Sequence, residues 1–257
     1  MNEQIKDQEK FYSVYRGRQG ALYHLAYMRT AKVKAVQHML GLNGISLRGI
    51  RILDYGFGTG TLFRACHPSC SIAGVEVDRE NVEAVRAMLT ARKFNVDDIQ
   101  QMDVAHWKEH PLLAADRVYD VIVLSHVLEH LDDPVEVLTR LGRNLAITGM
   151  IVVLLPLNEK RPDPNHKWVC DAELVERWAR SSGLVVADLK EMDHFVQPVQ
   201  PLLHGESGLR RVVAQGVSLG LGLLQAPFSP ATWFRIGGFM KYLGAKPGQL
   251  GAVLRKG

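Results

Sequence analysis

At residues 50–60 the chain reads Ile-Arg-Ile-Leu-Asp-Tyr-Gly-Phe-Gly-Thr-Gly, and this stretch decides the fold. An apolar run that ends in Asp54 and then in three glycines spaced two apart predicts a strand that leads into a tight turn. Glycine allows a positive φ and lets a ligand approach the main chain closely. The segment that follows, Thr61–Cys66, can open a helix whose N–H groups attract polar or anionic groups. We therefore expect a ligand to lie against this turn.

From this stretch onward, strands and helices alternate along the chain. Repeated β-α-β units with continuous apolar strands predict a parallel sheet covered by helices on both faces, whose ligands bind beyond the carboxyl ends of the strands. The predicted strands are Ile50–Asp54, Ser71–Val77, Ile99–Val104, Tyr119–Ser125, Met150–Leu155 and Leu184–Leu189. The predicted helices are one or two over residues 10–41, then Leu62–Cys66, Glu80–Arg92, Pro134–Leu145 and Asp171–Ser182, the last with an Asp N-cap and Gly183 after its end.

The composition fits one globular α/β domain with additions, because 47% of the 257 residues are hydrophobic and 23% are charged. The first residues carry no apolar run, and no segment reaches about 18 uninterrupted apolar residues, so neither a signal peptide nor a membrane-spanning helix is indicated. Cys66, Cys70 and Cys170 lack C-x-x-C spacing and are interpreted as free thiols of a reducing compartment. We expect a soluble, cytoplasmic protein.

The net charge of +4 hides an asymmetry along the chain. Lys and Arg outnumber Asp and Glu by eight to three in residues 1–48 and by seven to one in residues 196–257, whereas acids prevail by 23 to 16 in residues 49–195. The two basic ends can face a common anionic substrate or surface, or they can be solvated helix faces. Because basic clusters interleaved with aromatic residues are absent from the sequence, nucleic acid is not expected as a partner.

Acidic residues follow two of the predicted strands at places that suit a nucleotide. Glu76 ends the second strand 20 residues after Gly56, where a carboxylate can accept hydrogen bonds from ribose hydroxyls, and Asp78 is a close rival. Asp103 ends the third strand and can either accept from an exocyclic amine or cap the next turn. A dinucleotide site is a weaker alternative, because its fingerprint is G-x-G-x-x-G, whereas this chain reads G-x-G-x-G followed by Thr61.

Four motifs in this order resemble the class I S-adenosylmethionine-dependent methyltransferases, in the small-molecule group related to ubiquinone-biosynthesis-type O-methyltransferases. The motifs are Leu53–Gly60, Gly74–Asp78, Asp103, and Tyr119–Ile122 leading into Ser125–Pro134, and the resemblance covers residues 48–192. It implies a Rossmann-like, doubly wound sheet of seven strands in the order 3-2-1-4-5-7-6, with strand 7 antiparallel. The expected seventh strand is Gly248–Lys256, in which apolar residues alternate.

The resemblance also implies S-adenosylmethionine as the cofactor and S-adenosylhomocysteine as its product. In the family, the glycine turn contacts the amino-acid part of the cofactor, the acid of strand two holds the ribose, and the acid of strand three contacts the adenine. Phe57 departs from many relatives, which have a small residue or Cys there, and we expect it to narrow the turn. The expected cofactor-binding residues are Asp54, Tyr55, Gly56, Phe57, Gly58, Gly60, Glu76, Val77, Asp103, Val104 and Ser125.

Methyl transfer from a sulfonium needs an aligned nucleophile and, where required, a base that removes its proton. His126 directly follows the fourth strand and is the first candidate for that base, the alternative being a helix-opening histidine bonded to nearby backbone. His166 lies in the proline-containing segment Leu155–Trp168, which predicts an extended loop walling a substrate pocket, and is the second candidate, unless it is a solvated loop residue. His130 either contacts the substrate or organises the strand-to-helix turn.

The spacing His126-x-x-Glu129-His130 matches the H-x-x-E-H pattern of one group of zinc peptidases, which need a long helix in an unrelated fold. Some ubiquinone-type O-methyltransferases resemble E-x-x-E-H here and bind a divalent cation through it. This chain has His126 at the first position, which leaves a His/Glu/His site open. We expect no functional metal.

The segment 196–247 resembles the family least, because a short connection usually joins strands six and seven. It is rich in Leu, Gly, Pro and aromatic residues, with Glu206 as its one acid, and it predicts helices over Leu209–Gln225 that cover the pocket, form a homodimer contact or rest on a membrane surface. We expect an N-terminal helical segment at 1–48, a cofactor-binding core at 49–195, a substrate-cap insertion at 196–247 and a final core strand at 248–257. The expected substrate contacts are Tyr12, Tyr15, Arg29 and His130.

The sequence thus predicts an S-adenosylmethionine-dependent methyltransferase that acts on oxygen or nitrogen of a small acceptor, hydrophobic or anionic. Two alternatives from other classes stay open: a catalytically silent partner subunit with the same fold, and an NAD-linked oxidoreductase. The acceptor itself cannot be inferred from these residues.

Overall fold

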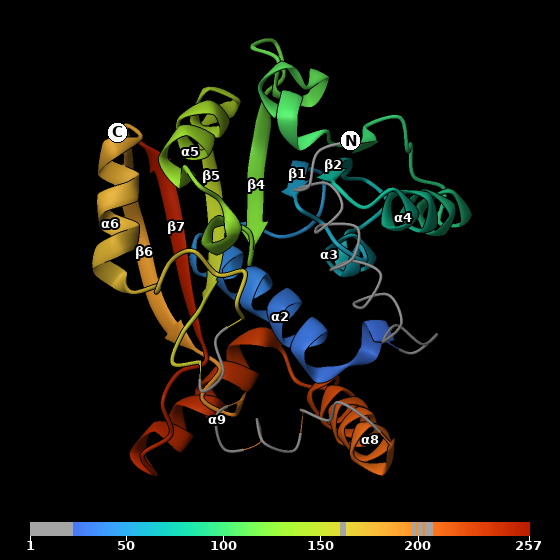
Figure 1. Ribbon diagram of the computed structural model, residues 1–257, viewed down its shortest axis with the longest axis vertical. Coiled ribbons are helices and arrows are strands. Elements are labelled where there is room, and N and C mark those ends of the chain that lie inside the picture. The colour runs from blue at the N-terminus through green and yellow to red at the C-terminus, as the bar shows by residue number, and fades with distance from the viewer. Residues whose placement is uncertain (1–22, 160–162, 197–198, 200–202, 204–207) are drawn as a thin grey trace.

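The computed structural model describes residues 23–159, 163–196, 199, 203 and 208–257. Its centre is a seven-stranded sheet in the order β3-β2-β1-β4-β5-β7-β6 (Figure 1). The first five strands pair in parallel, and β7 runs antiparallel to both β5 and β6. The order expected from the resemblance is therefore confirmed. The strands are β1 (Arg51–Tyr55), β2 (Ser71–Glu76), β3 (Ile99–Gln101), β4 (Tyr119–Ser125), β5 (Leu145–Pro156), β6 (Leu184–Met192) and β7 (Gln249–Lys256).

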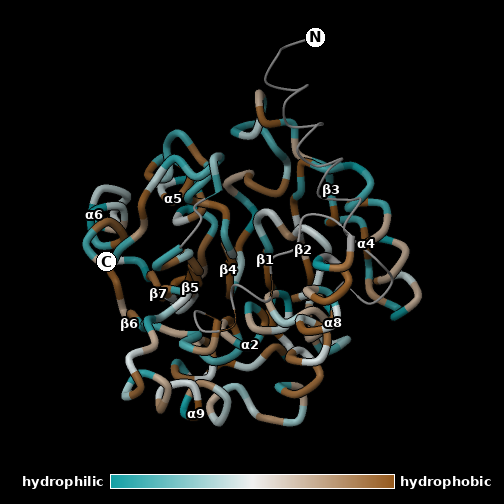
Figure 2. The backbone as a smooth tube through the Cα atoms, turned by 60° about the horizontal axis from the view of Figure 1, so that its bottom comes forward, coloured by the Kyte–Doolittle hydropathy of each residue, from teal (hydrophilic) through white to brown (hydrophobic). Residues whose placement is uncertain are grey.

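Helices cover both faces of the sheet and bury its apolar strands in two cores. One face carries α5 (Pro134–Arg143) and α6 (Ala172–Ser181), and the other carries α2 (Tyr27–Leu42), α3 (Thr61–Ala65) and α4 (Arg79–Ala91). Neighbouring strand residues alternate between the two cores, as Leu53 and Ile52 do. This explains why the central strands have continuous apolar sequences, which Figure 2 draws in brown.

Aspartates at the carboxyl side of the sheet begin three of these helices. Asp78, Asp133 and Asp171 accept backbone N–H bonds of 2.9, 2.9 and 2.7 Å at the starts of α4, α5 and α6. Each bond satisfies a donor that the first helical turn leaves unpaired. The predicted N-cap of α6 is confirmed, and Gly183 after that helix has a positive φ of 73°.

One predicted boundary was wrong at the carboxyl edge, and the predicted helix start at residue 10 lies outside the described residues. The third strand ends at Gln101 instead of Val104, because Asp103 accepts from Ala105 N–H and begins the 3-10 helix η2 (Val104–Glu109). The helix expected over residues 10–41 is described from residue 23 onward, as the 3-10 turn η1 (Tyr23–Leu25) and α2. Short 3-10 turns also occur at η3 (Pro111–Leu113) and η4 (Leu128–His130).

Helices α8 (Gly208–Gln225) and α9 (Pro230–Tyr242) lie between β6 and β7 in the chain and pack on α2 (Figures 1 and 2). The C-terminal half of α2 packs in the sheet core, whereas its N-terminal half extends past the carboxyl end of β4. Tyr27 joins these elements: its hydroxyl donates to Asp193 Oδ1 at 2.5 Å, and its ring makes an edge contact with Trp233. The insertion is therefore anchored to α2 by buried contacts.

Gly222 and Gly220 of α8 give a matched test of that anchoring. A Cβ at Gly222 would overlap the carbonyl oxygen of Leu25, whereas one at Gly220 would meet no atom of the described chain within 4 Å. We expect Gly222→Ala to lower the free energy of unfolding by about 1–3 kcal/mol through overpacking. Gly220→Ala should raise it by about 0.5–1 kcal/mol, because alanine favours a helix interior. Urea unfolding measures both, and equal effects would contradict the packing of α8 on η1.

Candidate functional site

The glycine turn after β1 holds three residues in the left-handed region. Gly56, Gly58 and Gly60 have φ values of 78°, 54° and 66°, where a side chain is strained. A Cβ at Gly56 would lie 2.7 Å from Val127 Cγ2, and one at Gly60 would lie 2.7 Å from Val85 Cγ2. A Cβ at Gly58 would meet only the Arg29 guanidinium, at 3.8 Å, among the described atoms. The turn is thus packed at both ends and open at its middle glycine, toward Arg29.

Glu76 is fixed against this turn at the end of β2. Its buried carboxylate accepts from Gly58 N–H at 2.7 Å and from the N–H groups of Val77 and Asp78 at 2.9 and 3.2 Å. Burial raises the pKa of Glu76, and the three backbone donors oppose that rise. Because two carboxylate oxygens offer about four acceptor positions, the group can also accept from a ligand hydroxyl.

Asp54 places a second buried carboxyl group beside Glu76. Burial, and then the charge of Glu76, raise the pKa of Asp54 to about 8. At pH 7 the Asp54 carboxyl group is therefore largely protonated, and a ligand with positive charge would favour its ionised form and that of Glu76. Arg29 partly balances them from α2, and burial lowers its pKa to about 10 against the opposing effect of Glu76.

Four further residues of the expected cofactor set differ in how they reach this turn. Phe57 is buried against Phe63, with ring centroids 5.6 Å apart, so its side chain belongs to the core and it meets the turn through its backbone. The expected narrowing by Phe57 was therefore wrong, because the ring points inward. Asp103 is exposed. One of its carboxylate oxygens accepts from Ala105 N–H at 2.9 Å, and the other lies 2.9 Å from His106 Nδ1. The neighbouring Val104 side chain is also exposed. Val77 lies between Glu76 and Asp78.

His126 turns sharply away from β4 with a φ of 57° and carries its imidazole into a buried site. Its Nδ1 lies 3.4 Å from Glu129 Oε1, and its Nε2 has no hydrogen-bond partner among the described residues. Burial, followed by repulsion from the basic side chains of Lys32, His166, His130 and Arg29, holds the pKa of His126 well below its usual range. The imidazole is therefore neutral at pH 7, and facing Glu129 favours the tautomer with its proton on Nδ1. The Ser125 hydroxyl beside it is also buried without a described partner.

Glu129 is fully buried, and neither carboxylate oxygen has a hydrogen-bond partner in the described part of the chain. Burial raises its pKa, and the Lys32 ammonium opposes that rise. Burial likewise lowers the pKa of Lys32, and Arg29 adds to this effect while Glu129 and Glu159 oppose it. Arg29 and Lys32 are three residues apart on α2 and so share one helix face. That face presents one cation to the glycine turn and one to Glu129.

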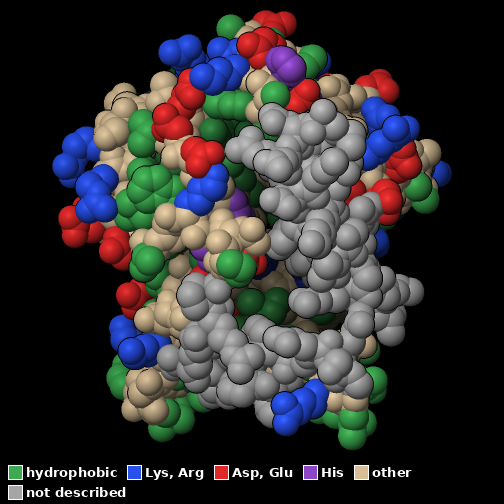
Figure 3. All heavy atoms as spheres, in the orientation of Figure 1, with side chains coloured by type: hydrophobic (Ala, Val, Ile, Leu, Met, Phe, Trp, Pro, Cys, Tyr) green, Lys and Arg blue, Asp and Glu red, His purple; other side chains and the backbone are tan. Residues whose placement is uncertain are grey.

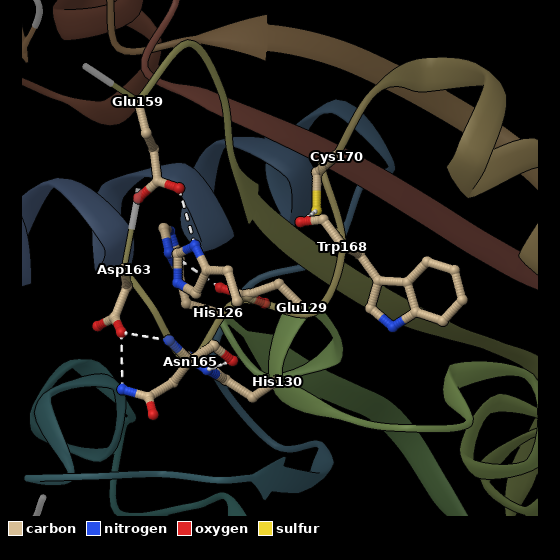
Figure 4. Close-up of polar contacts among 9 residues, drawn as sticks. His126, Glu129, His130, Glu159, Asp163, Asn165, Trp168 and Cys170 are labelled. Carbon is tan, nitrogen blue, oxygen red and sulfur yellow. Dashed lines mark hydrogen bonds and ion pairs between the residues drawn. The ribbon is translucent and has the colours of Figure 1, made fainter. Parts of the chain in front are cut away.

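The loop after β5 closes over η4, as Figure 4 shows. His166 Nδ1 lies 2.8 Å from Glu159 Oε2, and the His130 and His166 rings lie 4.8 Å apart. Lys167 N–H donates to the Glu129 carbonyl at 2.7 Å, and Trp168 Nε1 donates to the Leu131 carbonyl at 2.8 Å. The His166 side chain is 11% exposed, so the alternative of a solvated loop histidine was wrong. The described part of the loop places His166 near His126, and the substrate pocket that the loop is expected to line stays a prediction.

The structure brings most of the predicted groups into two adjoining halves. The first half contains the glycine turn, Asp54, Glu76 and Arg29, and the second half contains His126, Glu129, His130 and His166. Tyr12 and Tyr15 lie outside the described residues. Two signals in the sequence mark residues that the prediction did not assign to the site: the H-x-x-E-H spacing marks Glu129, and the i, i+3 pair of cations on α2 marks Lys32.

Comparisons with known proteins agree with this geometry. A family model described as a methyltransferase domain matches residues 24–186. A ubiquinone biosynthesis O-methyltransferase of Neisseria meningitidis serogroup C is 28% identical over 176 residues, which cover 58% of this chain and 70% of that protein. The solved structure of the (4+2)-cyclase SpnF is similar with a TM-score of 0.58 and 16% identity, over 87% of this chain and 80% of that one. The structure of coclaurine N-methyltransferase bound to N-methylheliamine and SAH is similar with a TM-score of 0.51 and 12% identity, over 85% of this chain and 71% of that one. At these identities the two structures support the fold alone.

Proposed function

Because the chain belongs to the class I S-adenosylmethionine-dependent methyltransferases, we propose that it transfers a methyl group from S-adenosylmethionine to an oxygen or nitrogen atom of a small acceptor. The observation that carries the proposal is the pair of buried carboxyl groups, Asp54 and Glu76, at a turn of three left-handed glycines. An NAD-linked oxidoreductase is not favoured, because neither the glycine spacing nor the family match supports it.

The residues of the glycine turn fit the charges of this cofactor. S-adenosylmethionine carries two cationic groups, a sulfonium and an ammonium, which would favour the ionised forms of Asp54 and Glu76 against the rise in pKa that burial causes. Its carboxylate suits Arg29, which faces the open middle glycine of the turn. In the family the acid of strand two holds the ribose, and we propose this role for Glu76. When bound, the cofactor supplies an electrophilic methyl group, and S-adenosylhomocysteine is its product.

His126 is placed to handle the proton of the acceptor. In a neutral imidazole whose protonated Nδ1 faces Glu129, Nε2 carries a lone pair, and no described residue forms a hydrogen bond with this nitrogen. We propose that Nε2 takes the proton from an acceptor hydroxyl or amine as the nucleophile is aligned, and that Glu129 stabilises the imidazolium that forms. His166 is the second candidate, since Glu159 holds its Nδ1 and leaves its Nε2 for the same task. Lys32 beside Glu129 favours an acceptor that carries negative charge.

Calorimetric titration of the purified protein with S-adenosylmethionine, S-adenosylhomocysteine and NAD tests the cofactor. We expect the first two to bind and NAD not to bind, and binding of NAD alone would overturn the proposal. A panel of phenols, amines, carboxylates and hydroxylated lipids then tests turnover by the release of S-adenosylhomocysteine. Turnover with any member excludes the catalytically silent subunit.

We also propose that the site works without a divalent metal. Candidate ligand atoms of Glu129, His130 and His166 lie within 4.8 Å of one another, so proximity alone does not exclude a metal ion. The cations Lys32 and Arg29 already face this side of the site and repel a dication. We expect neither EDTA nor added Zn²⁺ or Mg²⁺ to change the thermal midpoint of unfolding. A metal-dependent rise that His166→Ala abolishes would contradict this prediction.

A further inference from the structure

Large apolar side chains cover the outer sides of α8 and α9 and form what we call the α8–α9 face. Nine of them are between 40% and 87% exposed, and Figure 3 shows hydrophobic side chains at the two lower corners of the molecule. Large exposed apolar side chains grouped on two neighbouring helices are a feature of interaction sites. The nine residues are Leu209, Val212, Val213, Leu223, Leu224, Ile236, Phe239, Tyr242 and Leu243.

The opposite sides of both helices are fixed against α2. Gln225 of α8 is buried and donates to the Tyr27 carbonyl at 3.3 Å, and it also bonds to Thr30 Oγ1. Trp233 of α9 is buried and makes an edge contact with Tyr27 of α2, with ring centroids 6.4 Å apart, and it also stacks on Phe195 at 4.7 Å. The apolar side chains of the α8–α9 face therefore cannot turn inward without loss of these contacts.

None of the helices in the described ranges is by itself long and apolar enough to cross a membrane. The bent pair Val212–Gln225 and Pro230–Tyr242 passes that test by length and composition, with an angle of 119° between its halves. Because both halves are held on α2, this geometry suits helices that lie flat on a surface.

The charges around the face select the kind of surface. Glu206 is the last acidic residue of the chain, so residues 207–257 contain no Asp or Glu. Arg210, Arg235 and Lys241 are exposed on the same two helices. Phe239 and Tyr242 lie next to each other at the end of α9, with ring centroids 6.3 Å apart, and aromatic side chains prefer the level of lipid headgroups. Apolar side chains, aromatic anchors and unopposed cations together match an anionic bilayer.

A second copy of the chain matches this face less well. A two-fold symmetric contact places the same patch against itself, so the cations of one copy would meet those of the other. The absence of acidic residues after Glu206 leaves the two helices nothing with which to balance that repulsion. We propose that the α8–α9 face docks the protein on the surface of an anionic lipid bilayer. This proposal does not depend on the acceptor or on methyl transfer.

Flotation with unilamellar vesicles tests the docking on the full chain. We expect the protein to float with vesicles that contain phosphatidylglycerol, to float less at high salt, and to stay behind with pure phosphatidylcholine. The double variant Phe239→Asp/Tyr242→Asp should lower the partition constant at least about tenfold, because it puts two anions at the contact. Arg235→Gln/Lys241→Gln should weaken binding and reduce its dependence on salt.

Ile147→Asp is the matched control, because Ile147 is 93% exposed but lies near the start of β5, at the other end of the sheet. It should float like the parent protein. Circular dichroism and S-adenosylmethionine affinity show whether each variant is folded. Failure of the parent protein to float would overturn the proposal, as would equal losses in the Phe239/Tyr242 variant and the control. A concentration-dependent dimer that Phe239→Asp/Tyr242→Asp disrupts, without flotation, would assign the face to a second copy instead.

Discussion

Glu76→Ala is expected to weaken the binding of S-adenosylmethionine by about a hundredfold or more. Hydrogen bonds to a charged group contribute about 1.5–3 kcal/mol each, and the loss of two ribose hydroxyl contacts therefore amounts to two or more factors of ten. The substitution also removes the acceptor for Gly58 N–H and so loosens the glycine turn. Calorimetry with S-adenosylmethionine measures the change.

Two controls separate the ligand contact from the support of the turn. Glu76→Gln keeps an oxygen for Gly58 N–H but loses the charge, so we expect an affinity between those of the parent protein and of Glu76→Ala. Asp103→Asn changes an exposed carboxylate that is occupied by Ala105 N–H and His106, and its effect should be smaller. If Glu76→Ala lowers the thermal midpoint but leaves the affinity unchanged, Glu76 supports the turn and does not hold the ribose.

The parts of the fold that local sequence determines were predictable. The apolar runs indicated a parallel sheet buried on both faces, whereas the strand order was implied by the resemblance that four motifs carry. The structure confirms both, including the antiparallel β7. The positive φ values of the glycine turn followed from the glycines themselves. Asp171 as an N-cap and Gly183 after the helix are likewise local signals.

The contacts that tertiary packing determines were not predictable in the same way. Lys32 faces Glu129 only because α2 extends past the end of β4, and the spacing of apolar residues in α2 does not indicate this extension. The ring of Phe57 points into the core because Phe63 and Gly74 leave room for it there, which depends on how α3 packs on the sheet. His166 is enclosed because the loop bonds to η4 over a long sequence separation. The proline pattern indicated an extended loop but not its partner.

His126→Ala is the second large effect that we expect, this time on turnover. A positioned general base contributes about 10²–10⁴ to the rate, so kcat should fall by roughly that factor with any acceptor that gives turnover. S-adenosylmethionine affinity should change little, because the contacts of Glu76 with the glycine turn are kept. Glu129→Gln should lower kcat less, since it removes the charge that stabilises the imidazolium but leaves Nε2 in place. His166→Ala, measured in parallel, tests the second candidate base.

The pH dependence of kcat distinguishes a base from a residue that only shapes the pocket. Burial and neighbouring cations lower the pKa of His126, so its neutral form persists as the pH falls below 6.5, and turnover should decline only when the pH passes through that lowered pKa. Lys32→Met removes one of those cations and should raise the pKa of His126, which moves the acid limb of the profile to higher pH. Lys34→Met is the control, because the Lys34 ammonium donates to the Phe228 carbonyl and is not among the charges that shift the pKa of His126. Two results together would contradict a role of His126 in proton transfer: an acid limb that does not move in Lys32→Met, and a kcat that is unchanged in His126→Ala. This half of the site would then only align the acceptor.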